Sequence, residues 1–299
     1  NQLDTESASM LANVAKEKKI SLCGITPEQT AANFSGSGMK PADAILLTAD
    51  LAVRGSLTSI DVSHNSISGD GAQQLATVVL DKPTLESFCS IPLKELRADS
   101  LTTLDLKGKG LGVPEAMVLA DLLRSVSGSL TSLDLAVNSV GAEGATAIAD
   151  ALRVNASLTK LDVRSNGIKG DGASQLAAAV LANDKIEVFN NIPIKEMRED
   201  SLTELNLRGK PIGTPKEGGM GVEGGMVVAG LLPVMGSLTL LDLGFNKIRS
   251  EGAKAIGDAL NVNSSLTSLN LSSSSLCGVW SEWDGQRERI VEKGMYTAE

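Results

Sequence analysis

The sequence predicts an α/β fold in which short strands and helices alternate in stacked units to form a solenoid. Three observations lead to this prediction. A leucine motif recurs mostly every 28 residues, and within each copy the apolar spacing changes from that of a strand to that of a helix. Hydrophobic residues make up 42% of the 299 residues, but aromatic residues make up only 2%. A core of Leu, Ile, Val and Ala without large anchors suits repeated layers.

The repeat follows the motif L-x-x-L-x-L-x-x-N. Clear copies start at Leu57, Leu130, Leu158 and Leu238, and their asparagines are Asn65, Asn138, Asn166 and Asn246. Weaker copies start at Leu101, Leu202 and Leu266, and degenerate ones start near Gln29, Leu85 and Ile186. Successive starts are separated by 28, 28, 16, 29, 28, 28, 16, 36 and 28 residues. Self-similarity at a period of this length is typical of solenoids.

The unit at 157–180 shows how one repeat is expected to fold. Leu161 and Val163 alternate with outward-facing polar residues, which predicts a short strand. A Gly-rich turn then leads into a helix with Leu176 and Val180 on one face. Each unit has a single apolar side, so only stacking on its neighbours buries it. We expect the motif asparagine to hydrogen-bond backbone groups of adjacent turns, because these groups would otherwise lack partners.

A longer repeat is superimposed on the first one. The segment 84–110 returns at 185–211, shifted by 101 residues, so a block of four units is duplicated. The two 16-residue units keep about ten residues after their strands, which is too few for a full helix. We therefore expect gaps in the helical wall near 92–99 and 193–200, each filled by one turn from PLKELRAD or PIKEMRED.

The repeated wording resembles the leucine-rich repeat over about residues 29–276, and its 28-residue period resembles the ribonuclease-inhibitor-like class. The phrase GSLTSLDL, with following segments such as GAEGATAIADAL, is also similar to large leucine-rich repeat families of microalgae. The resemblance implies a horseshoe-shaped solenoid with a parallel β-sheet on the concave face and helices on the convex face. It implies about ten repeats, two of them short.

The two ends of the chain depart from the repeat. Residues 1–28 are expected to form an N-terminal cap, with a helix over SASMLANVAKEKK and a strand over ISLCGI, because an open solenoid end exposes apolar surface. Residues 277–299 are interpreted as a loop inserted into a further, incomplete repeat, so we expect the chain to continue or a partner to cover this end. Trp280 and Trp283 in this loop are candidate interface anchors. The alternative is that the loop folds back over the last layer.

The sequence predicts no catalytic, cofactor or metal site. His64 is the single histidine and is interpreted as a surface residue at the end of a strand. Cys23, Cys89 and Cys277 are too scattered for zinc spacing or a disulfide framework. The segment GMGVEG at 219–224 matches G-x-G-x-x-G, but about twelve residues separate it from the preceding predicted strand. A dinucleotide loop follows its strand directly, so a Gly-rich surface insertion explains this segment better.

The predicted concave face is the candidate binding surface. An acidic or amide residue stands between the two inward-facing positions of each strand, and a sparser set of cations stands two positions later. The first row is Asp61, Asp105, Asp134, Asp162, Asn206, Asp242 and Asn270, and the second row contains Lys107, Arg164 and Arg208. Solenoids often hold partners on such surfaces. The charged residues of both rows and the two tryptophans are therefore the candidate partner-binding residues.

Net charge and composition restrict the function. A formal net charge of −9 disfavours binding to nucleic acid or anionic membranes. No apolar stretch approaches the roughly 20 residues that span a bilayer, and three scattered cysteines favour a reducing, intracellular compartment, cytoplasmic or organellar. The leading hypothesis is a noncatalytic scaffold that binds a protein partner through the solenoid. Two alternatives stay open: a peripheral structural subunit of a large organellar assembly, such as a photosynthetic one, and a regulator of a small GTPase.

Overall fold

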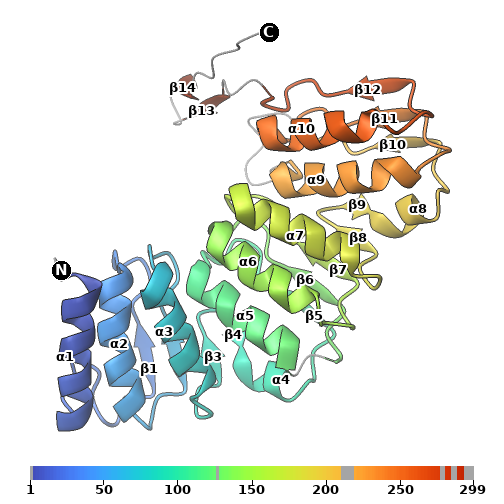
Figure 1. Ribbon diagram of the computed structural model, residues 1–299. Coiled ribbons are helices and arrows are strands. Elements are labelled where there is room, and N and C mark those ends of the chain that lie inside the picture. The colour runs from blue at the N-terminus through green and yellow to red at the C-terminus, as the bar shows by residue number, and fades with distance from the viewer. Residues whose placement is uncertain (1–2, 126–127, 210–218, 277–279, 284–287, 293–299) are drawn as a thin grey trace.

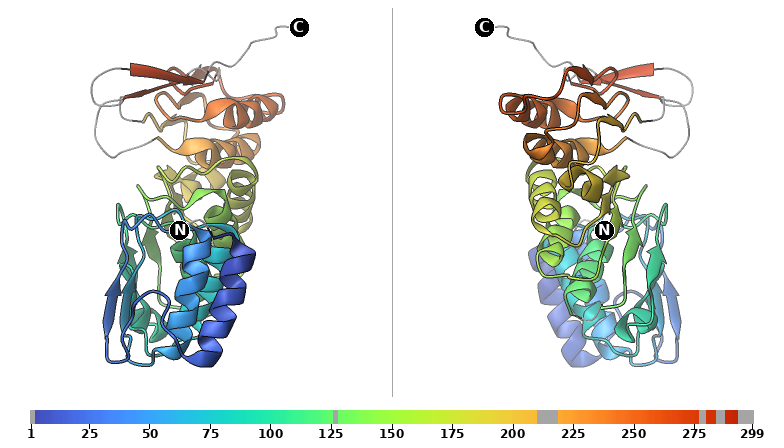
Figure 2. Two further views of the ribbon diagram at one scale, coloured as in Figure 1. Left: turned by 90° about the vertical axis from the view of Figure 1, so that its left-hand side faces the viewer. Right: turned by 90° about the vertical axis from the view of Figure 1, so that its right-hand side faces the viewer.

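The computed structural model describes residues 3–125, 128–209 and 219–276, together with the backbone of 280–283 and 288–292. Short strands line one side of the molecule and helices line the other (Figures 1 and 2). Strand and helix alternate along the chain, and successive units stack on one another. This arrangement confirms the predicted α/β solenoid.

Each full unit contributes one strand to the sheet and one helix to the wall. After α1 (Thr5–Lys18), the strand–helix pairs are β1 (Ala31–Asn33) and α2 (Pro41–Val53), β2 (Ser59–Asp61) and α3 (Gly69–Leu80), β5 (Thr103–Asp105) and α5 (Val113–Ser125), β6 (Ser132–Asp134) and α6 (Gly141–Leu152), β7 (Lys160–Asp162) and α7 (Gly170–Ala182), β10 (Glu204–Asn206) and α9 (Gly221–Leu231), and β11 (Leu240–Asp242) and α10 (Arg249–Leu260), with β12 (Ser268–Asn270) following. A short 3-10 helix at Leu232–Val234 follows α9.

The two 16-residue units have a different structure, in which a small hairpin precedes a single helical turn. Their elements are β3 (Ser87–Phe88), β4 (Ile91–Pro92) and α4 (Leu93–Arg97) in the first, and β8 (Val188–Phe189), β9 (Ile192–Pro193) and α8 (Ile194–Arg198) in the second. The short helices α4 and α8 confirm the expected turn in each unit. The hairpins were not expected.

These hairpins divide the sheet into three segments. Within the described residues the strand orders are β1-β2-β3-β4, β5-β6-β7-β8-β9 and β10-β11-β12. Both breaks follow a short unit, because there the chain turns back as an antiparallel strand. The gaps expected in the helical wall near 92–99 and 193–200 are therefore wrong: α3 contacts α5, α7 contacts α9, and the discontinuity lies in the sheet.

One arginine from each short helix ties that helix to the preceding full one. Arg97 donates hydrogen bonds to four backbone carbonyls at the end of α3 and in the loop after it. Arg198 makes the same set of four bonds beside α7. Carbonyls at a helix C-terminus lack intrahelical partners, and the five N–H groups of a guanidinium can satisfy several of them at once.

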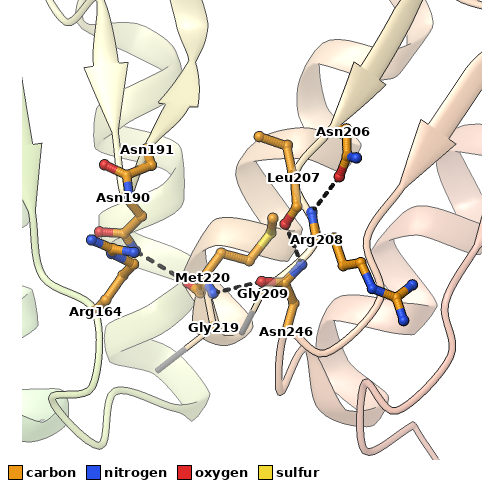
Figure 3. Close-up of a pocket in the computed structure, with 10 residues that line it drawn as sticks. All are labelled: Arg164, Asn190, Asn191, Asn206, Leu207, Arg208, Gly209, Gly219, Met220 and Asn246. Carbon is orange, nitrogen blue, oxygen red and sulfur yellow. Dashed lines mark hydrogen bonds between the residues drawn. The ribbon is translucent and has the colours of Figure 1, made fainter. Parts of the chain in front are cut away.

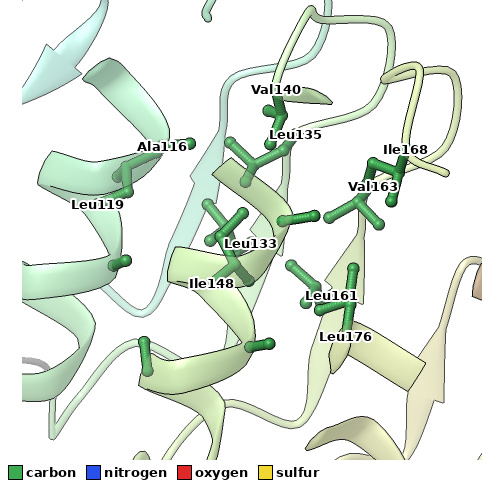
Figure 4. Packing of buried hydrophobic residues seen from close by; sticks show 14 of the residues in the cluster. Ala116, Leu119, Leu133, Leu135, Val140, Ile148, Leu161, Val163, Ile168 and Leu176 are labelled. Atoms are coloured by element: carbon green, nitrogen blue, oxygen red, sulfur yellow. The ribbon is translucent and has the colours of Figure 1, made fainter. Parts of the chain in front are cut away.

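Aliphatic side chains from strands and helices interdigitate between neighbouring units (Figure 4). Leu133 of β6 and Leu161 of β7 are register partners. Ile148 and Leu176 approach them from α6 and α7, and all four side chains are at most 1% exposed. The burial predicted for the motif leucines is thereby confirmed.

The motif asparagines form the expected ladder. Asn138 Nδ2 donates to the carbonyl oxygens of Leu106 and Leu135, the residues directly after β5 and β6, at 2.9 and 2.8 Å. Its Oδ1 accepts from the Leu111 amide at 3.0 Å. Equivalent bonds are made by Asn65, Asn166 and Asn246. Each side chain thus satisfies backbone groups of two adjacent turns, as predicted.

At the N-terminal end the expected helix is confirmed as α1, but residues 20–25 form no strand, so that part of the prediction is wrong. The carboxylate of Asp50 in α2 is completely buried and accepts hydrogen bonds from the Leu22 and Cys23 amides and from Ser21 Oγ. Because one buried side chain satisfies these donors, the segment needs no ladder of backbone bonds.

A buried glutamate lies at each break in the sheet, in the first turn of α5 and of α9. Glu115 is 1% exposed and accepts a hydrogen bond from Cys89 Sγ, which lies 3.0 Å away in the first hairpin turn. Glu223 is 3% exposed and accepts from Asn190 Nδ2, 3.2 Å away in the second hairpin turn. Burial raises the pKa of both carboxyl groups, that of Glu223 to about 8.

After the last unit, β13 (Trp280–Trp283) pairs with β14 (Glu288–Glu292) in an antiparallel hairpin. This hairpin falls within the segment predicted to be an inserted loop, residues 277–299. The remainder of that segment and the side chains of Trp280 and Trp283 lie outside the described residues. The anchoring role of these tryptophans therefore stays a prediction.

Truncation of Leu161 tests the stacking of the units. Leu161 is completely buried, so Leu161→Ala is expected to lower the free energy of unfolding by about 2–5 kcal/mol. Leu240→Ala is the control, because Leu240 is 37% exposed, and its loss is expected to stay below about 1 kcal/mol. Urea unfolding followed by circular dichroism measures both. Equal losses would contradict the burial of the motif leucines.

The buried carboxyl of Glu223 predicts a pH-dependent stability. The pKa of Glu223 is higher in the folded protein than in the unfolded chain, so the protonated carboxyl group of Glu223 stabilises the fold at low pH. That contribution is lost as the pH rises from about 4.5 to about 8. Glu223→Gln cannot ionise, so the decline in unfolding free energy between pH 5 and 8 is expected to become smaller. Urea unfolding at several pH values measures this, and an unchanged decline would show that Glu223 titrates normally.

Candidate partner-binding surface

The sheet face carries the predicted row of acidic and amide side chains in three runs, one on each sheet segment. Asp105, Asp134 and Asp162 are register partners in β5, β6 and β7, so their strands lie about 4.8 Å apart. The remaining register partners are Asp61 with Asn33, and Asp242 with Asn206 and Asn270. The structure thus brings three of the predicted carboxylates together, while the two breaks separate the others from them.

Each side chain of this row closes a turn at the end of its strand. Asp134 Oδ1 accepts a hydrogen bond from the Ala136 amide, two residues further on, at 2.8 Å. The same bond, at 2.8–3.0 Å, is made by Asn33, Asp61, Asp105, Asp162, Asn206, Asp242 and Asn270. Such an Asx turn needs a side-chain oxygen and no charge. The recurrence of either Asp or Asn at this position is the sequence signal for it.

The turns therefore do not explain why most positions of the row carry a charged Asp and not a neutral Asn. Asn206 and Asn270 close the same turn while remaining neutral. Asp105 and Asp134 instead place carboxylates on neighbouring strands. The pKa of Asp134 is raised, chiefly by partial burial and further by the nearby carboxylates of Asp162 and Asp105. Mutual repulsion is a cost that folding alone does not explain.

Two of the predicted cations are paired with members of the row. Arg164 donates to both carboxylate oxygens of Asp162 at 2.7–3.0 Å, and these two side chains are 20% and 7% exposed. This pair is part of the packed structure. Arg208 lies 3.5 Å from the Asp242 carboxylate, and its guanidinium stands over the Phe245 ring, 4.6 Å from the ring centre.

The charge of the row is thus least compensated at Asp61, Asp105 and Asp134, which we call the acidic row. Asp105 is exposed, and Asp61 and Asp134 are half-buried. Of the predicted cations, Lys107 is the one that acts on the pKa of Asp134, which it lowers. Asp105 and Asp134 lie in the second sheet segment, and Asp61 lies across the first break from them.

A pocket of about 220 Å³ opens at the second break, between the β8–β9 hairpin and β10 (Figure 3). Its polar side chains are Arg164, Asn190, Asn191, Asn206, Arg208 and Asn246. Several of these groups already serve the fold: Asn190 donates to the Met220 carbonyl, and Asn246 donates to the Leu207 carbonyl. The Arg208 guanidinium points away from the other lining residues in Figure 3. The pocket therefore does not join the two predicted arginines into one site.

The glycines of GMGVEG have a structural explanation. A Cβ atom added to Gly219 would lie 2.3 Å from the Asn246 backbone, and one added to Gly224 would lie 2.6 Å from Met220 Cβ. Gly221 has a φ of +76°, which other residues rarely adopt, and it begins α9. The segment thus begins α9, and Met220, Val222 and Glu223 are buried, so the predicted Gly-rich surface insertion is wrong for 219–224.

The histidine and the two described cysteines are held in the packed structure. His64 donates its backbone amide to the Gly110 carbonyl at 2.8 Å, and its ring lies against Gly110. Burial raises the pKa of the Cys23 thiol to about 12 and also raises that of the Cys89 thiol, so both are poor nucleophiles. Cys277 lies outside the described residues. Within the described part of the chain, no group of three or more His, Cys, Asp or Glu side chains could hold a metal ion.

The helices of the described residues are all too short or too polar to cross a membrane.

Comparison with known proteins identifies the repeat. The family model described as "Leucine Rich repeat" matches residues 56–76, 127–149, 154–177 and 237–257. Curated proteins give no significant match.

This chain is also similar to three solved structures, each at a TM-score below 0.5. The leucine-rich repeat-containing protein LegL7 from Legionella pneumophila is 20% identical, with 85% of this chain and 69% of that chain covered and a TM-score of 0.27. An internalin (inlF) from Listeria monocytogenes is 14% identical, with 88% of each chain covered and a TM-score of 0.26. The TLR13–ssRNA13 complex is 17% identical, with 76% of this chain but 30% of that chain covered and a TM-score of 0.22. The family-model match shows that this protein carries leucine-rich repeats, and the stacked strand–helix units of its described residues form a leucine-rich repeat solenoid.

Proposed function

We propose that this protein is a noncatalytic scaffold that docks a protein partner on its concave sheet face, at the acidic row. The observation that carries this proposal is the use of Asp at positions where Asn closes the same turn. A set of unneeded, mutually repelling carboxylates on a polar solenoid face is a feature expected of a binding surface. Catalysis has no support from the described residues, because the buried carboxyl groups of Glu115 and Glu223 lie at the breaks in the sheet and that of Asp50 binds the segment at 21–23.

The charge of the acidic row also indicates the chemistry of the partner. Asp105 and Asp134 form a local negative field, and Asp61 adds to it across the first break. A partner surface with Lys or Arg side chains would relieve the repulsion between these carboxylates and would be steered towards them. We therefore propose a basic protein partner.

Further properties are proposed on separate grounds. The 28-residue period and the helix in each full unit support assignment to the ribonuclease-inhibitor-like class. The free thiols of Cys23 and Cys89 support the proposed intracellular location. A peripheral subunit of an organellar assembly, suggested by the similarity to microalgal families, and a GTPase regulator would both dock a partner in the same noncatalytic way. The identity of the captured partner distinguishes them.

Replacement of the acidic row by asparagine tests the proposed function. In the triple variant Asp61→Asn, Asp105→Asn and Asp134→Asn the turns keep their side-chain oxygens, so stability is expected to change by less than about 1 kcal/mol. Recovery of a specific partner by affinity purification from the native cell, quantified by mass spectrometry, is expected to fall by about tenfold or more.

The matched control replaces Asp171, Asp184 and Asp258 with Asn, which removes the same charge from exposed positions elsewhere. This control is expected to retain the partner. Arg164 is not a suitable probe, because it is packed against Asp162. Equal recovery of partners by the wild type and the acidic-row variant would contradict the proposal.

A further inference from the structure

The helix that follows the first break lies deeper in the molecule than its neighbours. Nine of the 13 residues of α5 are buried, including Pro114 and Glu115 in its first turn. Glu143 at the start of α6 accepts a hydrogen bond from the Gly69 amide at the start of α3, at 2.8 Å. The ends of α3 and α6 thus meet although α5 lies between them in the chain order. The consequence is a groove on the convex side, with α5 as its floor.

This convex groove has a volume of about 500 Å³. Its apolar lining comes from three helices: Ala76 and Leu80 of α3, Met117 of α5 and Ala147 of α6. Leu80, Met117 and Ala147 are half-buried, so they keep accessible apolar surface in the absence of a partner. Small residues on both walls leave the floor open, which makes the groove suitable for inserted side chains.

The second break shows how such a groove can be closed. There α9 follows the short unit, and a Cβ atom added to Gly230 would lie 2.4 Å from Leu181 Cδ1. Leu181 of α7 therefore lies directly over α9. At the first break Leu80 corresponds to Leu181, because LATVVL in α3 matches LAAAVL in α7. Asp121 corresponds to Gly230, because GVPEAMVLADLL matches GVEGGMVVAGLL. Asp121 has a side chain where Gly230 has none, so Leu80 cannot cover α5 in the same way.

The rim of the convex groove is acidic. Four carboxylates line it, against a single guanidinium, that of Arg124, and the four are Asp81, Asp121, Glu143 and Asp150. Asp81 is the C-cap of α3, where the helix dipole disfavours a negative charge. Asp121 pairs with Arg124 and Asp150 pairs with Arg153, but these are exposed i,i+3 pairs that screen the rim only weakly.

We propose that the convex groove docks an amphipathic helix from a partner protein, with an apolar face flanked by Lys or Arg. Leucine-sized side chains at i, i+4 and i+7 of such a helix would enter the groove over Met117. Basic side chains on long stems would reach the carboxylates of Asp81, Asp121 and Asp150 on the rim. This site is separate from the acidic row, because it lies on the helical side of the solenoid.

A designed peptide tests this site without knowledge of the natural partner. The probe is a fluorescently labelled helix of about 18 residues with Leu on one face and Lys on the other. Fluorescence anisotropy is expected to show saturable binding to the wild type that weakens as salt rises. Met117→Lys with Asp121→Lys is expected to weaken binding by about tenfold or more, and Asp81→Asn with Asp150→Asn by a smaller factor. A peptide with Ser in place of Leu is expected to bind at least about tenfold more weakly.

The acidic-row triple variant is the control, because it loses three negative charges from the opposite side. It is expected to bind the Leu/Lys peptide within about twofold of the wild type, which separates this site from the concave one. Thermal melting verifies that each variant is folded. Binding that is absent, insensitive to the groove variants or reduced as strongly by the control would overturn the proposal. So would a wild-type dimer that the Met117→Lys and Asp121→Lys changes make monomeric, because the occupant would then be a second copy of this chain.

Discussion

Burial of the leucines of one repeat against the next is the interaction on which the rest of this structure depends. Ile148 and Leu176 from the helices of their own units pack on Leu133 and Leu161, and the register of the neighbouring strands completes the burial of both leucines. The motif asparagines, such as Asn138, add hydrogen bonds to this apolar packing, because each one links its own turn to the preceding turn. Nearest-neighbour contacts of this kind make stability a property of the array rather than of any single unit.

The two 16-residue units interrupt the array. The hairpins, the buried glutamates and the bridging arginines all lie at these interruptions. Because the hairpin turns the chain back, the sheet ends and the next helix is drawn inwards, which buries Glu115 and Glu223 at the breaks. Arg97 and Arg198 satisfy backbone carbonyls at the C-terminal ends of α3 and α7. The duplicated segments make the two breaks alike, but Asp121 lines the open convex groove at the first break, whereas Gly230 lies under Leu181 at the second.

Residue spacing was enough to predict the strands, the full helices, the asparagine ladder and the single turns of α4 and α8, because these follow from local periodicity. The breaks required knowledge of pairing between strands. Asn190 and Asn191 both have a positive φ, and two such residues between short apolar runs are a hairpin signal that the repeat pattern hides. The residues at 20–25 have a strand-like composition, but the buried Asp50 takes their amides. The concave charges were located from sequence, whereas their turn-closing role became visible only as hydrogen bonds.

Hydrogen exchange followed by NMR tests the division of the sheet most directly. The Ser132 amide of β6 donates a hydrogen bond to the Thr102 carbonyl, next to β5. Thr103 is the register partner of Ser132 in β5, but β5 is the edge strand of its sheet segment, so no preceding strand among the described residues offers the Thr103 amide such a carbonyl. The amide of Thr103 is expected to exchange at least about tenfold faster than that of Ser132, and the amide of Glu204 faster than that of Leu240 by a similar factor. Equal protection at these paired positions would mean that the strands continue across the short units, and the segmented solenoid would then be wrong.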